Sequence, residues 1–163
     1  VNNAANDQRH ETLKTDETFW DWSINVNLRS YFFACQSVIP GMQAAGGGSI
    51  INFSSISYMM ADKGYAAYIT ANAGIVGLTR TLAREFGPDR VRVNAVAPGW
   101  VLTDRQKEHW VTPEALAAHL ARQCLPDPIQ PDDMAGIVLF LASDASRMMT
   151  SQTLILDGGY ISS

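Results

Sequence analysis

Four polar side chains stand where an α/β sheet would hold a ligand. Ser54 and Ser55 follow the apolar segment 50–53, and Tyr68 and Asn72 lie one turn apart on one face of the helix expected next. Ligands of such sheets bind beyond the carboxyl ends of the strands. A tyrosine can accept the proton of an alcohol, and a serine hydroxyl can hydrogen-bond the same oxygen. This combination favours chemistry at a C–OH or C=O group.

The elements that would position these side chains follow from the apolar pattern. Short apolar segments at 50–53, 91–96 and 154–156 predict strands. Between them, helical spacing predicts one long helix over 16–42, kinked or tightened near Pro40, and a second over 66–86 that contains small residues for close helix packing. Thr112-Pro113-Glu114 and Gln130-Pro131-Asp132 each open a further helix.

Alternation of short strands with long helices predicts an α/β fold with a parallel sheet and helices on both faces. We expect residues 1–163 to form one Rossmann-like, doubly wound domain. Such a domain has two βαβαβ halves, and at about 30 residues per βα step this chain holds only the second half. We therefore expect a truncated fold, in which the first strands and the Gly-rich cofactor loop are missing. Gly46-Gly47-Gly48 precedes a strand and is a turn.

Composition excludes several classes of function. The 163 residues are 47% hydrophobic and 17% charged, which is typical of a packed globular domain, and the net charge of −4 gives little support to a nucleic-acid or anionic-membrane surface. Cys35 and Cys124 lack the spacing of a disulfide framework or a metal site, so we expect no metal. No apolar segment is long enough to span a bilayer and no signal peptide is evident. We expect a soluble, cytoplasmic protein.

Several motifs at family-like spacing give the chain a specific resemblance. They are Asn-Asn-Ala-Ala at 2–5, Asn-Val-Asn-Leu at 25–28, Ser54-Ser55, the helix that carries Tyr68, Asn94 to Gly99 with Thr103, and Asp157-Gly158-Gly159. With these motifs the chain resembles the C-terminal two-thirds of a short-chain dehydrogenase/reductase. The resemblance covers essentially every residue and implies hydride transfer between a nicotinamide cofactor and a CH–OH group.

The resemblance also implies a catalytic set, which is Asn27, Ser55, Tyr68 and Asn72. Tyrosinate would take the hydroxyl proton, and the serine hydroxyl would hydrogen-bond the oxygen as it becomes a carbonyl. In the family a lysine holds the nicotinamide ribose and makes the tyrosine more acidic. Here that lysine falls on Asn72, which carries no charge, so we expect Tyr68 to titrate near its reference pKa of about 10. Catalysis would be impaired as a result.

NAD or NADP is the implied cofactor, and the residues that would choose between them lie in the part of the fold expected to be missing. The implied cofactor contacts are Asn3, Ala4, Tyr68, Asn72, Pro98, Gly99, Val101 and Thr103. Without a pyrophosphate-binding helix N-terminus, we expect this chain alone to bind the dinucleotide weakly or not at all.

Within the family, segments 6–10 and 98–106 with Trp110 are similar to NAD(P)-dependent aldose 1-dehydrogenases, which implies an aldose sugar oxidised at C1. The implied substrate contacts are Asn6, Arg9, His10, Ser57 and Trp100. The plain alternative is that Arg9 and His10 solvate a loop and Trp100 packs a lid. Two other functions stay open: another reductase of this family, for ketones, steroids or 3-oxoacyl groups, and a non-catalytic fragment or pseudoenzyme.

The two long helices also indicate association. Segments 16–42 and 66–86 carry apolar residues on more than one face, and in the family these helices build a four-helix contact between subunits. We expect a homodimer or homotetramer through them. Aggregation through an exposed sheet edge is the competing outcome.

Overall fold

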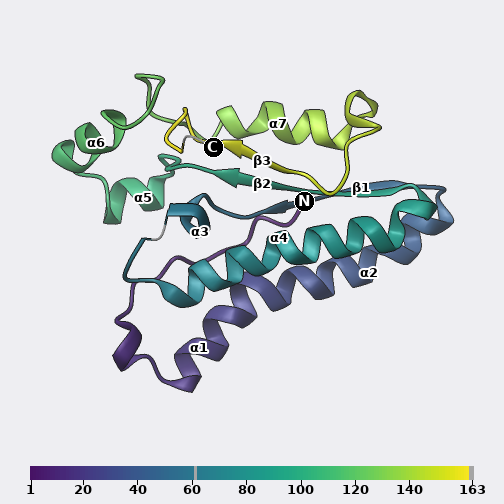
Figure 1. The fold of residues 1–163 in the computed structure, drawn as a ribbon, viewed down its shortest axis with the longest axis horizontal. Coiled ribbons are helices and arrows are strands. Elements are labelled where there is room, and N and C mark those ends of the chain that lie inside the picture. Colours follow the sequence, from purple (N-terminus) through teal and green to yellow (C-terminus); the bar gives the residue numbers. More distant parts are fainter. Residues whose placement is uncertain (61, 162–163) are drawn as a thin grey trace.

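A three-stranded parallel sheet lies between helical layers in the computed structural model, which describes residues 1–60 and 62–161 (Figure 1). The strands β1 (Gly48–Phe53), β2 (Val91–Pro98) and β3 (Thr153–Leu156) pair in the order β1-β2-β3. Asn2 adds a single parallel bridge to Asn52 of β1. The predicted α/β class and the parallel sheet are confirmed.

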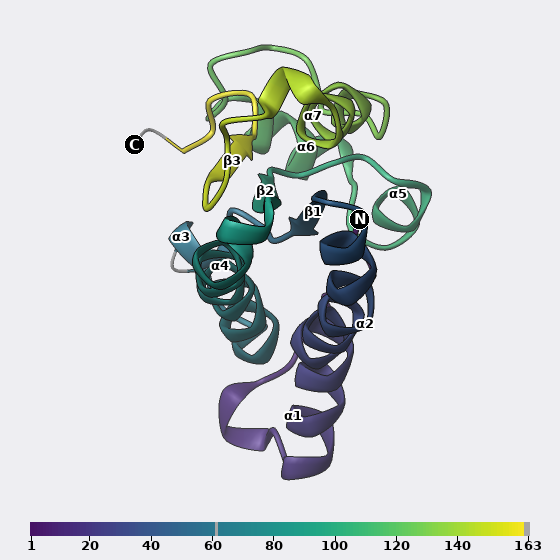
Figure 2. The same ribbon diagram turned by 90° about the vertical axis from the view of Figure 1, so that its right-hand side faces the viewer.

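The long helices cover the two faces of this sheet (Figure 2). On one face lie α1 (Glu17–Ile24), α2 (Ser30–Ala44) and α4 (Ala66–Phe86), and on the other lies α7 (Asp133–Ala142). The short helices α3 (Ser57–Met60), α5 (Asp104–His109) and α6 (Pro113–Leu120) gather near the carboxyl ends of β1 and β2. No helix in the described part of the chain is both long and apolar enough to cross a membrane.

The first helical segment differs from its prediction. Instead of one α-helix over 16–42, the wider π-turn Asn25–Arg29 joins α1 to α2, and Pro40 is accommodated inside α2, which continues to Ala44. Within the π-turn, the Asn27 side chain donates to the carbonyl of Ser23, four residues earlier, at 2.9 Å. Side-chain bonds of this kind compete with the backbone ladder. The interruption therefore lies at Asn27 and not at the proline.

Neighbouring residues of β1 build the core on both sides of the sheet. Ile50 packs with Cys35, Ile39 and Val93 beneath α2 and α4. Ile51 packs with Val96 and Leu141 beneath α7, on the other face of the sheet. Successive side chains of a strand point to opposite faces, so a strand that is buried on both faces reads as a continuous apolar segment. This explains why Ile50 and Ile51 predicted a buried strand.

The helix α4 follows its predicted bounds from Ala66 to Phe86. One of its small residues permits close packing, because a Cβ added to Gly74 would lie 2.8 Å from Cδ2 of Leu28 in the π-turn. At Gly77, another glycine of α4, an added Cβ would meet no neighbouring atom within 4 Å. Close approach of α4 to the first helical segment therefore depends on Gly74.

Replacing Ile51 by alanine tests the two-sided core. Ile51 is 1% exposed, so Ile51→Ala should lower the free energy of unfolding by about 2–5 kcal/mol through lost burial and the cavity left behind. Urea unfolding followed by circular dichroism measures the change. Leu139→Ala on the outer side of α7 is the control, since Leu139 is 69% exposed and its loss should change stability by less than about 0.5 kcal/mol. Equal losses for the two variants would contradict the described packing.

Candidate active site

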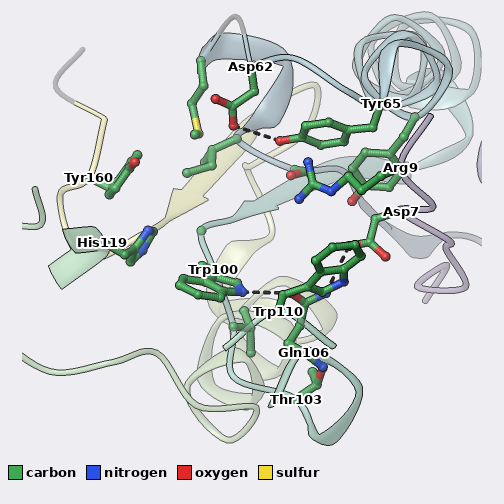
Figure 3. Close-up of a pocket in the computed structure, with 16 residues that line it drawn as sticks. Asp7, Arg9, Asp62, Tyr65, Trp100, Thr103, Gln106, Trp110, His119 and Tyr160 are labelled. Carbon is green, nitrogen blue, oxygen red and sulfur yellow. Dashed lines mark hydrogen bonds between the residues drawn. The ribbon is translucent and has the colours of Figure 1, made fainter. Parts of the chain in front are cut away.

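A cavity of about 510 Å³ opens at the carboxyl ends of β1 and β2 (Figure 3). Its lining comes from segments far apart in the chain: residues 7–9, 55–60, 62–68 and 99–110, with His119 and Tyr160. Parallel strands bring their carboxyl ends to one edge of the sheet, which explains why these segments meet. Ser55 and Tyr68 both line the cavity.

Hydrogen bonds tie the end of β1 to the first turns of α4. The Ser54 hydroxyl donates to the backbone carbonyl of Asn72 at 2.9 Å, and the Asn72 side chain donates to the backbone carbonyl of Tyr68 at 2.9 Å. The Ser55 hydroxyl oxygen accepts the backbone N–H of Ser57 at 3.2 Å. Asn72 is only 3% exposed. The predicted serine, tyrosine and asparagine therefore form one compact cluster.

The surroundings of Tyr68 favour its neutral form. Burial raises the pKa of Tyr68 above its usual value, and the charge of Asp7 raises it further, while hydrogen bonds with Ser55 and Asn72 and the charge of Arg9 act in the opposite direction. The expectation that Tyr68 titrates near its reference pKa is therefore wrong. Burial disfavours the phenolate, and the neutral Asn72 supplies no cation to offset that cost.

Asn27 uses its side chain to hold the amino-terminal segment. Its side-chain oxygen accepts the N–H of Asn6 at 2.7 Å, and its amide donates to the carbonyl of Asn6 at 3.0 Å as well as to Ser23. The residue is 1% exposed and does not line the cavity. Asn27 thus clamps the segment after Asn2-Asn3 against the π-turn, and its catalytic role stays a prediction.

One wall of the cavity combines a cation with aromatic rings. The Arg9 guanidinium carbon lies 3.7 Å from the ring centroid of Tyr65 and 5.4 Å from that of Trp110. The Tyr65 hydroxyl donates to Asp62 at 2.9 Å, and burial together with this bond raises the pKa of Tyr65 to about 12. In the described part of the chain, the salt bridges do not include Arg9. Its guanidinium therefore brings unneutralised N–H donors to the cavity.

A second wall is built from three aromatic rings in contact. Trp100 meets His119 edge-on, with ring centroids 5.2 Å apart, and His119 stacks on Tyr160 at 4.3 Å with an interplanar angle of 14°. Burial lowers the pKa of His119, so this wall is uncharged at neutral pH. Flat, uncharged rings of this kind suit the C–H face of a sugar.

Three predicted substrate residues lie outside the cavity lining. The ring Nε2 of His10 accepts the N–H of Ala67 at 3.3 Å, at the amino end of α4. The backbone of Asn6 is bound to Asn27, and Ser57 is buried with a hydroxyl that has no partner among the described residues. Their contact with substrate stays a prediction, whereas Arg9 and Trp100 line the cavity as expected.

The predicted cofactor residues divide in the same way. Gly99, Val101 and Thr103 line the cavity with Tyr68, and Asn3, Ala4, Pro98 and Asn72 are absent from its described lining. Gly99 packs against the end of β3, because a Cβ there would lie 2.9 Å from Cα of Asp157. The glycine therefore serves this close approach. The role of all eight residues toward a cofactor stays a prediction.

Comparison with known proteins places the chain in a family. A family model described as enoyl-(acyl carrier protein) reductase, of the short-chain dehydrogenase/reductase type, matches residues 1–161. The chain belongs to the short-chain dehydrogenase/reductase family. It is 52% identical over 159 residues to a protein of Rhizobium meliloti named probable galactose dehydrogenase, and 49% identical over 160 residues to a D-xylose 1-dehydrogenase of Caulobacter vibrioides.

The match extends over nearly all of this chain. It covers 98% of the chain in both alignments and spans 62% and 64% of the length of the two relatives. The fold superimposes with a TM-score of 0.91 and 28% identity on a solved 4-hydroxyisoleucine dehydrogenase in complex with NADH, covering 96% of this chain and 65% of that one. The resemblance found in the sequence motifs is therefore confirmed at the level of the family.

Sequence reasoning missed several cavity residues of this short-chain dehydrogenase/reductase. They are Asp7, Asp62, Tyr65, Gln106, His119 and Tyr160. Asp7 and Gln106 lie inside segments that the motifs singled out, so the signal was present at the level of the segment. Tyr65 lacks the catalytic spacing from Ser55, and His119 and Tyr160 stand in no motif that links them. Their place in the wall follows from chain folding alone.

Restoring a cation at position 72 tests the electrostatics of Tyr68. A charge about 4 Å away at an effective dielectric of 20 is worth roughly 4 kcal/mol before screening, so Asn72→Lys should lower the pKa of Tyr68 by up to about three units. Ultraviolet titration of tyrosinate measures the pKa, with Tyr68→Phe identifying the contribution of this residue. Asn72→Leu, which is also uncharged, should leave the pKa raised. An unchanged pKa in the folded lysine variant would show that another group controls Tyr68.

Proposed function

We propose that the protein carrying this sequence is an NAD(P)-dependent dehydrogenase that oxidises an aldose at C1 to a lactone. The observation that carries the proposal is the Ser55–Tyr68 pair at a cavity walled by Arg9 and by aromatic rings. The named galactose and xylose dehydrogenases among its relatives support the substrate class.

In this reaction the bonds broken in the sugar are C1–H and the C1 hydroxyl O–H. Tyr68, as its phenolate, accepts the hydroxyl proton, and Ser55 hydrogen-bonds the same oxygen while the new C=O forms. The nicotinamide ring, when bound, accepts the hydride. Because burial raises the pKa of Tyr68, little phenolate exists at neutral pH, and we expect the rate to rise with pH.

The donor set at the cavity fits the nicotinamide-ribose end of the cofactor. Thr103 and Tyr68 offer hydroxyl groups at the cavity, while Asn72 lies one turn from Tyr68 and outside the described lining. The hydroxyl groups at the cavity would hold a ribose diol and the nicotinamide carboxamide by hydrogen bonds. The NADH bound to the superimposable 4-hydroxyisoleucine dehydrogenase supports this assignment.

Recognition of the sugar would divide between the two walls. The Arg9 guanidinium presents a planar fork of donors that matches two neighbouring hydroxyl oxygens. Trp100, which meets His119 edge-on, would present an aromatic surface to the apolar face of the sugar ring. A polyol needs both kinds of contact, whereas a hydrophobic steroid would leave the Arg9 donors unpaired.

A non-catalytic protein is the second candidate, and Asn72 is the observation that favours it. The family lysine is replaced by a buried neutral residue, which leaves the tyrosine without its activating cation. Such a protein would keep the fold and the association surfaces while losing turnover.

Sugar-dependent reduction of NAD⁺ or NADP⁺ by the natural polypeptide that carries this sequence tests the proposal. We expect activity with galactose, xylose or arabinose that is lost in Tyr68→Phe and reduced at least about tenfold in Arg9→Ala, mainly through KM. Tyr58→Phe, on α3, is the matched tyrosine control and should keep the rate. Turnover of a ketosteroid or 3-oxoacyl substrate in place of sugars would overturn the substrate class. Absence of any turnover across pH 6 to 10, a range of about four units that ends at the tyrosine reference, would favour the non-catalytic candidate.

A cytoplasmic location is part of the same proposal, and the two free cysteines of the described chain suit it. We also propose that the protein associates through α1 and α2. Large side chains on α1 and α2 remain 37–47% exposed: Trp20, Trp22, Phe32, Phe33 and Val38. Exposed apolar groups gathered on neighbouring turns are typical of an interface.

Light scattering tests this association. We expect a dimer or tetramer, and Phe32→Glu with Phe33→Glu should shift it toward the monomer by placing charges in the contact. Leu139→Glu, which changes a more exposed apolar residue on α7, is the control. A stable monomer of the unmodified chain at micromolar concentration would contradict the proposal.

A further inference from the structure

The helix α5 forms part of the cavity wall but has no apolar anchorage of its own. It is six residues long, from Asp104 to His109, and contains no buried residue. Helices this short are not stable by themselves in water. Thr103 caps its amino end, with the side-chain oxygen accepting the N–H of Gln106 at 3.3 Å, but this cap is local and does not fix α5 to the rest of the molecule.

Long-range polar contacts of α5 converge on one carboxylate. Oδ1 of Asp7 lies 3.0 Å from Nη2 of Arg105, and Oδ2 of Asp7 accepts the side-chain amide of Gln106 at 3.1 Å. The same Arg105 nitrogen lies 3.4 Å from the side-chain oxygen of Asn6. Asp7 follows the segment that Asn27 clamps to the π-turn, so its own backbone is held close by. Both carboxylate oxygens are therefore engaged by α5.

Gln106 also links α5 to Trp100 in the aromatic wall of the cavity. Gln106, which donates to Asp7, accepts the indole N–H of Trp100 at 2.8 Å. An amide that donates at one end and accepts at the other fixes the orientation of both partners. Trp100 in turn meets His119 edge-on. The labelled side chains of Asp7, Gln106 and Trp100 follow one another along this side of the cavity in Figure 3.

We propose that Asp7 is a positioning residue that holds α5, and through Gln106 the indole of Trp100, in place at the wall of the cavity. Each of the two carboxylate oxygens of Asp7 contacts one side chain of α5 in this arrangement. Its side chain is 17% exposed and that of Arg105 is 45% exposed, so the contact is partly shielded from water. Loss of the carboxylate would release α5 from the rest of the site while leaving the core untouched.

Limited proteolysis of the chain tests this inference without substrate or cofactor. Trypsin cleavage after Lys107 in α5 reports local opening of the helix. Asp7→Asn, which keeps the size of the side chain and removes its charge, should accelerate this cleavage about tenfold. Arg105→Gln should produce a similar acceleration. Asp104→Asn is the control: its carboxylate is on α5 and lies 3.9 Å from Lys107, but it does not contact Asp7, and cleavage should stay within about twofold.

The double variant distinguishes a shared contact from two separate effects. If Asp7 and Arg105 act through one interaction, Asp7→Asn combined with Arg105→Gln should be cleaved no faster than the faster single variant. Multiplied effects, or cleavage of Asp7→Asn at the unmodified rate, would overturn the proposal. Should Asp7→Asn lower the unfolding midpoint, the surface variant Arg105→Gln carries the test alone.

A kinetic readout applies where the enzyme turns over sugar, and it rests on the proposed function. Arg105→Gln keeps the Asp7 charge near Tyr68, so it should raise KM with little change in the pH dependence of kcat. Asp7→Asn should raise KM and also move the rise of kcat with pH to lower pH, because the Asp7 carboxylate contributes to the raised pKa of Tyr68. A failure of sugar turnover leaves the proteolysis result intact, so the two proposals fail separately.

Discussion

Parallel pairing of β2 with β1 on one side and with β3 on the other is the constraint on which the site depends. Because all three strands run the same way, Ser55 after β1 and Gly99 after β2 emerge at the same edge of the sheet. The connecting chain must return along a face of the sheet, so α4 starts at that same edge and brings Tyr68 in its first turn. The proximity of Ser55 and Tyr68 is thus a consequence of strand direction, and short hydrogen bonds from Ser54 and Asn72 complete their position.

Burial and charge oppose one another at this pair. The packing that places Tyr68 beside Ser55 also removes it from water, which raises the pKa of Tyr68. A neighbouring cation would offset that cost, but residue 72 is an asparagine that is itself buried, and the Arg9 cation is opposed by the Asp7 carboxylate. The packing that organises the site therefore also disfavours the phenolate of Tyr68.

The cavity walls are assembled by polar and aromatic contacts between loops instead of by the core. Arg9 stacks on Tyr65, and Asp7 reaches α5 through bonds to residues almost a hundred positions later. The short helices α5 and α6 contain no buried residue, so their places depend on such contacts. The sheet thus fixes Ser55 and Gly99 through backbone pairing, whereas the cavity walls depend on side-chain contacts between loops.

The amino-acid sequence alone determined the fold class, the bounds of α4 and the cluster of Ser55, Tyr68 and Asn72, because these depend on local periodicity and on motifs whose spacing reflects one strand and one helix. It also indicated the family, which the comparisons confirm. The π-turn at Asn27 was not predicted, since it arises from a side-chain bond that competes with the backbone and leaves the apolar pattern unchanged. The raised pKa of Tyr68 and the meeting of Asp7 with α5 were decided only by the tertiary structure, because burial and contacts between distant segments exist only after the chain has folded.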